Sequence, residues 1–400
     1  MSNKEERKAP VLRFKGFTDD WEQRKFTELG KLYYGKSAPK WSVVEKGGTP
    51  CIRYGELYTK YSSKIDNVYS HTSIDKSKLK FSTGNELLIP RVGEEPLDFA
   101  KHTSWLSIPN VAIGEMITVL KTKENPLFLA NYLRAKYVFK FARLVEGGNV
   151  SNLYFERYED TNILIPSKNE QQNISKLILK IDKLITLQQR KLEQLELLQK
   201  SILQTIFTSN NKKEKIELNK LANYRRGSFP QPYTNKKWYG GKNSKPFVQV
   251  IDVNDNLKLH EQTKERISEI AQPKSVFVPK GSIIVTLQGS IGRVAITQYD
   301  SYVDRTLLIL TDFKKKIDKY YFANALKMVF NKEKLKAPGG TIKTITKSTL
   351  SSFKIVLPNI KLQIQYGKLL KSVDKQFILN KNRIMKLKKI KQFLLQNIFI

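Results

Sequence analysis

Two stretches of the chain carry apolar residues at the alternating four- and three-residue spacing of a coiled-coil seam. The first seam runs through Ile181, Ile185, Gln188, Leu192, Leu195, Gln199, Ile202 and Ile206. The second runs through Val373, Phe377, Asn380, Ile384, Leu387, Lys391, Leu394 and Ile398. Polar residues interrupt both seams at equivalent places, and a buried polar residue in a seam typically sets register and partner. The pattern therefore predicts two long helices that pair with each other, whereas a helix packed only on its own domain is the alternative.

These two stretches are copies of one another. Residues 163–207 align without a gap with residues 355–399 at an offset of 192, with 13 identities. The same offset relates Gly35 to Gly227, far upstream of the helices. An internal repeat of this length indicates a tandem architecture. The sequence predicts two copies of one unit, each a variable globular region followed by a more similar helix.

We expect the two helices to pair antiparallel, because the seam spacing reads the same in both directions. The apolar layers would then be Leu192 with Leu387, Leu195 with Ile384, Ile185 with Leu394, and Ile181 with Ile398. The polar residues would also meet, Gln188 with Lys391 and Gln199 with Asn380, so that each gains a polar partner. A parallel pair would instead place Gln188 beside Asn380.

The regions outside the seams have the pattern of mixed α/β domains. Strand-like apolar runs occupy residues 86–89, 247–251, 282–287 and 306–310, and helix-like runs occupy residues 127–141 and 319–330. The predicted fold class is α+β, with two similar mixed α/β domains separated by two long antiparallel helices in a pseudo-twofold tandem repeat. The predicted boundaries are 1–165 for the first domain, 166–210 for the central helix, 211–357 for the second domain and 358–400 for the C-terminal helix.

The net charge of the chain indicates an anionic partner. The 400 residues include 71 Lys and Arg against 37 Asp and Glu, a formal net charge of +34, while 40% of residues are hydrophobic. Such repulsion is relieved by an anionic partner, most often nucleic acid and next a membrane surface. Cys51 is the only cysteine, which excludes disulfides within the chain, and residues 1–10 do not have the pattern of a signal peptide. We expect a cytoplasmic protein that meets nucleic acid; a basic structural protein, such as a ribosome-associated one, is the alternative.

Motifs that would carry chemistry are weak. Residues 30–37 match the phosphate-loop pattern G-x-x-x-x-G-K-S, but Pro39 follows almost at once and the second copy lacks the pattern, so a strand leading into a basic turn is favoured. Residues 125–128 are similar to the N-P-P-F site of amino-methyltransferases without its second proline, and also suit a helix start. His71, His102 and His260 have no metal-ligand spacing, and Glu94 and Glu95 suit a charged loop better than a nuclease site.

Basic and polar residues form a more informative set, because Lys and Arg bind phosphates while Arg, Gln and Asn can read base edges. In the first copy the candidate DNA-binding residues are Lys36, Lys40, Arg53, Tyr54, Lys60, Lys64, Arg91, Asn149, Ser151 and Asn152. In the second copy they are Arg225, Arg226, Lys236, Lys237, Lys242, Gln249, Arg293, Arg305, Thr341, Lys343 and Thr344. A solvated charged surface is the competing interpretation.

Several segments together carry a resemblance to one family. They are residues 12–17 and 21–25 near the start, residues 148–166 before the first helix, Glu170-Gln171 and Ile181-Asp182 within it, and residues 281–292 in the second copy. The boundary between globular region and helix in the second copy has the corresponding residues Gly340, Pro358, Gln363 and Val373-Asp374. It differs from the family pattern at Leu362, where the family has Glu. With the tandem repeat, this combination resembles the specificity subunit of type I restriction–modification systems over nearly the whole chain.

The resemblance implies the function. Each globular unit would be a target-recognition domain for half of a split DNA site, and the helices would be a spacer and a docking surface for two methylation subunits. Those partners would hold S-adenosylmethionine and methylate adenine, while restriction subunits with ATP and Mg²⁺ would complete an endonuclease complex for phage defence. The chain itself would carry no metal, cofactor or catalytic residue.

Two other classes of function compete with this reader of DNA sequence. A nuclease or methyltransferase in its own right needs a complete catalytic set, which the sequence does not display. A basic coiled-coil scaffold that binds nucleic acid outside restriction–modification would show the charge, but not two divergent globular regions of similar size.

Overall fold

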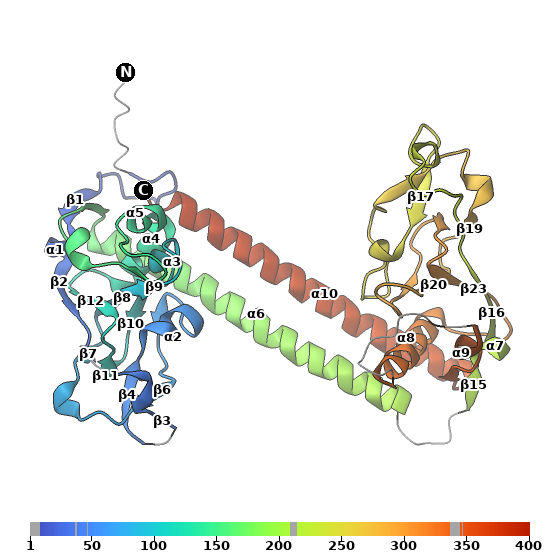
Figure 1. Cartoon of the computed structure of the whole chain (residues 1–400), viewed down its shortest axis with the longest axis horizontal. Helices are drawn as coiled ribbons and strands as arrows, with labels where there is room; N and C mark the ends of the chain where they lie inside the picture. The colour runs from blue at the N-terminus through green and yellow to red at the C-terminus, as the bar shows by residue number, and fades with distance from the viewer. Residues whose placement is uncertain (1–8, 37, 46, 209–213, 337–344, 346) are drawn as a thin grey trace. The chain divides into compact units, whose positions relative to one another are not determined.

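The computed structural model describes residues 9–36, 38–45, 47–208, 214–336, 345 and 347–400. The chain divides into two compact units, Met1–Gln188 with Arg383–Ile400 (unit 1) and Gln189–Asn382 (unit 2). Each unit therefore contains one globular region and parts of both long helices, α6 (Lys168–Thr208) and α10 (Ile360–Asn397), labelled in Figure 1. No helix in the described part of the chain is long and apolar enough to cross a membrane.

Unit 1 is built on two five-stranded sheets. The first has the order β2 (Gly30–Tyr34), β12 (Ile117–Thr122), β8 (Glu86–Pro90), β10 (Ser104–Leu106) and β5 (Lys64–Ile65). The second has the order β3 (Val43–Val44), β6 (Ser70–Thr72), β4 (Thr49–Ile52), β11 (Pro109–Ile113) and β7 (Phe81–Thr83). Two short pairs complete it, β1 (Glu22–Lys25) with β14 (Asn162–Ile165) and β9 (Val92–Gly93) with β13 (Ser151–Asn152). Its short helices are α1 (Phe26–Leu29), α2 (Tyr54–Thr59), α3 (Asp98–Lys101), α4 (Pro126–Lys136) and α5 (Val138–Ala142).

Unit 2 repeats this topology with fewer strands. Its first sheet has the order β16 (Ala222–Arg226), β23 (Leu307–Phe313), β20 (Ile283–Thr286) and β21 (Val294–Ile296). Its second has the order β18 (Glu265–Ile267), β17 (Lys245–Val248), β22 (Ser301–Val303) and β19 (Val276–Val278). The remaining elements are the pair β15 (Lys215–Glu217) with β24 (Lys354–Val356), and the helices α7 (Leu218–Leu221), α8 (Lys319–Lys336) and α9 (Lys347–Ser351).

The sheets confirm most of the predicted elements. The runs at residues 86–89, 282–287 and 306–310 are strands, and residues 319–330 lie in a helix. The run at residues 247–251 is only half right, because β17 ends at Val248 and the backbone N–H of Gln249 donates to the Asp252 carboxylate at 2.8 Å, which turns the chain. The helix predicted at residues 127–141 is divided into α4 and α5 at Tyr137.

The C-terminus belongs to the aromatic core of unit 1. Phe399 stacks on Tyr132 with ring centroids 5.2 Å apart, and Trp21 meets Tyr132 and Phe128 edge to face at 5.7 Å. These rings are almost fully buried. Because such a core loses several kcal/mol when an aromatic ring is removed, it fastens the end of α10 to the first globular region.

The long helices pair antiparallel within each unit, as predicted. In unit 1, Ile174 and Ile178 share a core with Ile398 and Phe399, whereas Asp182, further along α6, reaches back to Lys391, with Oδ1–Nζ at 2.6 Å. In unit 2, Gln199 donates to the Asp374 carboxylate. The repeat offset of 192 converts one polar pair into the other, since Asp182 corresponds to Asp374 and Gln199 to Lys391. The two units thus make the same contact at equivalent positions of the sequence repeat.

The predicted polar partners of the seam are wrong. All sixteen seam residues are buried or half-buried, but Lys391 and Gln199 bond to the aspartates beside the seam and not to Gln188 and Asn380. A carboxylate makes a stronger hydrogen bond than a neutral amide, which explains this choice. The side-chain oxygens of Gln188 and Asn380 remain buried without a hydrogen-bond partner. The four facing apolar layers stay predictions.

Two glycines fix the place where the chain passes from one sheet to the other. A Cβ on Gly35 would lie 2.1 Å from the carbonyl oxygen of Gly114, and a Cβ on Gly227 would lie 2.1 Å from that of Val303. Both obstacles are backbone atoms, which cannot move aside as a flexible side chain can. Each sheet crossing therefore requires glycine.

We expect Gly35→Ala to lower the free energy of unfolding of unit 1 by at least about 2 kcal/mol, the range of an overpacked interior. Gly55→Ala is the matched control, because Gly55 lies in α2 and a Cβ added there would have no other atom within 4 Å, and alanine favours a helix by up to about 1 kcal/mol. Urea unfolding followed by circular dichroism measures both. Equal stability of the two variants would contradict the close approach.

Candidate nucleic-acid interface

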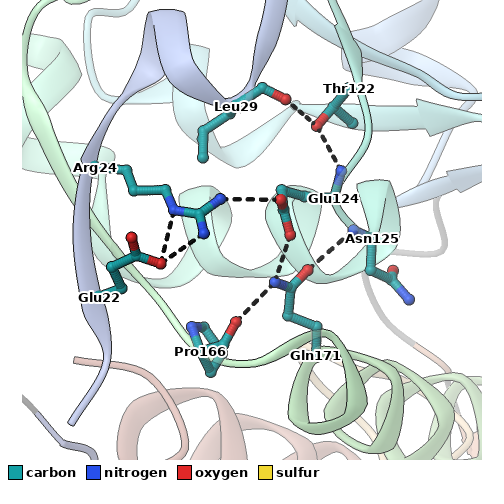
Figure 2. A network of polar contacts seen from close by, with 8 residues as sticks. All are labelled: Glu22, Arg24, Leu29, Thr122, Glu124, Asn125, Pro166 and Gln171. Carbon is teal, nitrogen blue, oxygen red and sulfur yellow. Dashed lines mark hydrogen bonds and ion pairs between the residues drawn. The ribbon is translucent and has the colours of Figure 1, made fainter.

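A buried glutamine joins each globular region to its long helix. The Gln171 side chain, which is fully buried, accepts a hydrogen bond from the Asn125 backbone N–H at 2.9 Å. Its amide nitrogen donates to Glu124 Oε2 at 2.8 Å and to the Pro166 carbonyl at 2.9 Å. Figure 2 shows these bonds and the continuation of the network, where Arg24 bridges Glu124 and Glu22. Gln171 thereby fixes the first turn of α6 to the strand before it and to the start of α4.

Unit 2 contains the same junction. Gln363 is 1% exposed, accepts from the backbone N–H of Asp318 at 3.1 Å and donates to the Pro358 carbonyl at 2.7 Å. Asp318 and Asn125 also play the same part, since each caps the helix that follows it, bonding Tyr321 N and Phe128 N. The proline and the glutamine of each junction are thus among the residues that the two sequence copies share.

The N-terminal segment is attached to this junction in unit 1. Arg13 and Glu170 form a two-bond ion pair, with Nε–Oε1 at 2.7 Å and Nη2–Oε2 at 2.8 Å. The hydrogen bond to Glu170 raises the pKa of Arg13 above its usual value. Leu12 N also donates to the Asn397 carbonyl at 2.9 Å. In the second copy Leu362 stands where Glu170 stands in the first, so this ion pair has no counterpart there.

The DNA-binding candidates of unit 1 fall into two groups. Lys36, Lys40, Tyr54 and Asn149 are exposed, and Arg53 and Asn152 are half-buried. Others already have partners inside the unit: Lys60 pairs with Glu56 at 2.8 Å, Lys64 lies 3.4 Å from Asp66, and the Arg91 guanidinium lies 4.7 Å from the centre of the Tyr34 ring. Ser151 is 3% exposed in β13, so solvent does not reach its side chain.

The candidates of unit 2 are more open. Arg225 and Arg226 on β16, Lys236 and Lys237 in a 3-10 turn, and Lys242 and Arg305 are exposed, and Gln249 is half-buried. The Arg305 guanidinium lies 5.2 Å from the Tyr233 ring centre, and Arg293 pairs with Asp255 at 2.9 Å. Thr341, Lys343 and Thr344 lie outside the described residues. Lys274, which the sequence did not single out, is also exposed, with its ammonium 4.9 Å from the Trp238 ring centre.

The weak motifs have structural explanations. Residues 30–34 of the phosphate-loop pattern are strand β2, which pairs with β12 along its whole length. Asn125 caps α4 through its side chain, with Pro126 in the first turn, which confirms the helix start. Within the described residues, no group of three or more His, Cys, Asp and Glu side chains could hold a metal ion. Burial raises the pKa of the Cys51 thiol to about 11.

Comparison with known proteins fits this duplicated architecture. The family model of the type I restriction modification DNA specificity domain matches twice, over residues 18–197 and 210–389. The chain belongs to this family. Its members are the non-catalytic DNA-recognition subunits of type I restriction–modification complexes, and the chain is such a specificity subunit.

The chain is also similar to individual proteins over most of their length. A Methanocaldococcus jannaschii protein assigned as the type I restriction enzyme MjaX specificity subunit is 22% identical over 384 residues, covering 89% of this chain and 87% of its own length. The S subunit of a type I system from M. genitalium has the same fold, with a TM-score of 0.65, 16% identity and coverage of 98% and 99% of the two chains. A chain from a study of assembly and conformational transition in a type I system matches with a TM-score of 0.55, 14% identity and coverage of 95% and 97%.

Replacing the junction glutamine tests its role in the specificity subunit. Gln171→Ala removes the hydrogen-bond partner of the Asn125 backbone N–H and of Glu124 Oε2, while Arg24 still bonds Glu124 Oε1. We therefore expect unit 1 to lose about 1–3 kcal/mol and the amides at the start of α4 and α6 to exchange faster with deuterium. Gln172→Ala is the control, because Gln172 is the exposed neighbour on the same helix. Hydrogen exchange read by mass spectrometry resolves the segments. The junction would lose its assigned role if both variants exchanged alike.

Proposed function

We propose that this specificity subunit reads a split DNA target with one recognition domain on each half-site. The observation that carries the proposal is the repetition of one topology and one domain–helix junction in two units whose exposed side chains differ. The glutamine that both units share at the junction, Gln171 and Gln363, is buried. The divergent parts include exposed basic residues on both units, which suit DNA phosphates. The domains that we propose are residues 1–165 and 211–357, with spacer helices at 166–210 and 358–400.

The long helices would set the distance between the half-sites. α6 has 41 residues, which at ~1.5 Å per residue gives a length of about 60 Å. The same polar contact occurs within each unit, as Asp182–Lys391 and as Asp374–Gln199, and an antiparallel pair of helices would relate the two recognition domains by a pseudo-twofold operation. A twofold-related pair of readers suits a target whose halves are read in opposite senses.

The outer faces of the helices would dock two methylation subunits. Unit 1 exposes Leu187 of α6 (59%) and Ile390 of α10 (49%). The repeat offset converts them into Leu379 of α10 (40%) and Leu198 of α6 (49%), which unit 2 exposes. Each unit therefore presents the same pair of exposed apolar residues, one from each helix. Exposed apolar residues in equivalent places support two equivalent docking sites.

The chemistry would belong to the partners. Methylation subunits would bind S-adenosylmethionine and extrude the target adenine before methylating it. Restriction subunits with ATP and Mg²⁺ would join to cut unmodified DNA. We place the subunit in the cytoplasm, because its proposed work is on cellular and invading DNA.

The purified chain should bind duplex DNA with steep salt dependence, because each phosphate contact contributes about −0.9 to the slope of log K against log salt. Replacing Lys236 and Lys237 with Gln should flatten this slope by about two. Lys176→Gln with Lys180→Gln is the control, since it removes the same charge from exposed positions on α6. Fluorescence anisotropy across a salt series measures all three proteins.

Two outcomes would overturn the proposal. An equal change of slope in both double variants would show general charge attraction and not a contact in the recognition domain. Methylation, cleavage or ATP hydrolysis by the purified chain alone would show that it is an enzyme in its own right.

A further inference from the structure

Three chain segments converge at the same place in both units, at the end of a parallel strand pair. In unit 1 the pair is β4 with β11, and Gly114 N donates to Ile52 O at 2.9 Å where both strands end. In unit 2 the pair is β17 with β22, and Asp304 N donates to Val248 O at 3.0 Å. The third segment follows the glycine crossing described above, with Lys36 N donating to Ile113 O at 2.8 Å and Ser228 N to Val303 O at 3.0 Å. The backbone of the two units is equivalent at this place.

A buried acidic side chain fixes the residue that follows β4 in unit 1 and the residue that follows β17 in unit 2, and both residues have the same extended conformation. Arg53 N donates to Glu56 Oε2 at 3.1 Å, and Gln249 N donates to Asp252 Oδ2 at 2.8 Å. In return, the carbonyls of Arg53 and Gln249 accept from the backbone N–H of these acids at 3.0 Å each. Glu56 is 5% and Asp252 2% exposed, and a residue fixed by buried hydrogen bonds can place its side chain accurately.

The side chains that this fixed backbone presents are different in the two units. The three positions hold Lys36, Arg53 and Glu115 in unit 1, and Ser228, Gln249 and Arg305 in unit 2. Solvent reaches all six, which are exposed or half-buried. A structural role would keep the residue type, as the junction keeps Gln171 and Gln363. A domain that reads base edges needs a backbone that stays the same and accessible polar side chains that can differ, and these three positions have both.

The side chains of Arg53 and Gln249, which hold the central of the three positions, indicate which bases each unit would read. Arg forms two hydrogen bonds to the O6 and N7 atoms of guanine, and Gln forms two to the N6 and N7 atoms of adenine. Arg53 Nε donates to the Ala38 carbonyl at 3.3 Å, which orients the guanidinium and leaves the N–H groups of its Nη atoms for a ligand. We infer that Arg53 reads a guanine in one half-site and that Gln249 reads an adenine at the equivalent position of the other half-site. The residues at the two other positions, Lys36 and Glu115 in unit 1 and Ser228 and Arg305 in unit 2, would contact the neighbouring bases. This inference rests on the proposed function.

Reciprocal exchange tests it in the full-length subunit assembled with its methylation subunits. The target of each variant is determined by selection from randomised duplex DNA and sequencing. Arg53→Gln should change or relax one base pair of one half-site, with at least about a fivefold loss of preference for guanine there, since one bidentate contact discriminates by about 1–3 kcal/mol. Gln249→Arg should change one base pair of the other half-site only, at the equivalent position.

Two further variants separate reading of bases from charge and from folding. Arg53→Lys keeps the charge and loses the two-pronged geometry, so preference should fall while overall affinity stays within about twofold. Lys40→Gln removes one exposed charge nearby, so affinity for all sequences should fall together. A target unchanged by both exchanges, in a complex that still selects DNA, would overturn the inference alone. Failure of the unaltered complex to select any sequence would overturn the proposed function itself.

Discussion

A fully buried glutamine amide must find a partner for its oxygen and for its nitrogen, because an unpaired polar group in a protein interior costs about 1–3 kcal/mol. At Gln171 and Gln363 those partners come from two sequence-distant places, the residue that caps the helix of the globular region and the proline that precedes the long helix. The demand for hydrogen bonds therefore dictates how each long helix leaves its domain. The direction in which each long helix leaves its globular region is in turn the starting point for the contacts between α6 and α10 within each unit.

The second constraint is that the repeated sequence must form the same contact between the long helices in each unit, an aspartate on one helix bonded to a polar residue on the other. Asp182 with Lys391 and Asp374 with Gln199 occupy the same place under the repeat, although one is an ion pair and the other a bond to an amide. Tyr320 also donates to Asp374 in unit 2, which compensates for the missing ammonium. The duplication has thus preserved the carboxylate and allowed its partners to change. The same division holds at the proposed reading position, where the buried acid stays and the residue it fixes differs.

The sequence predicted the helices and the fold class because both depend on short-range periodicity. The seam spacing, the shared prolines and the shared glutamines need no knowledge of the sheets. The sequence did not predict the polar partners of the seam, because the heptad pattern defines only the seam positions, and Asp182 and Asp374 lie one residue outside them.

The equivalence of Arg53 and Gln249 was also beyond an ungapped comparison. These residues are 196 apart, whereas Lys36 and Ser228 are 192 apart and Glu115 and Arg305 are 190 apart. Loops of different length shift the offset, and only the hydrogen bonds between strands reveal which residues correspond. Ser228 and Glu115 carried no signal in the sequence that could have singled them out.

Two recognition domains that act independently on one molecule are the central requirement of the proposed function. The most direct test replaces residues of roughly 30–160 with the corresponding region of another specificity subunit and reads the modified sites by methylation sequencing in cells that supply the methylation subunits. We predict that one half of the target changes and that the other half and the spacing between them stay as they were. A change in both halves, or an altered spacing, would contradict the division of the chain into two separate readers on a common pair of helices.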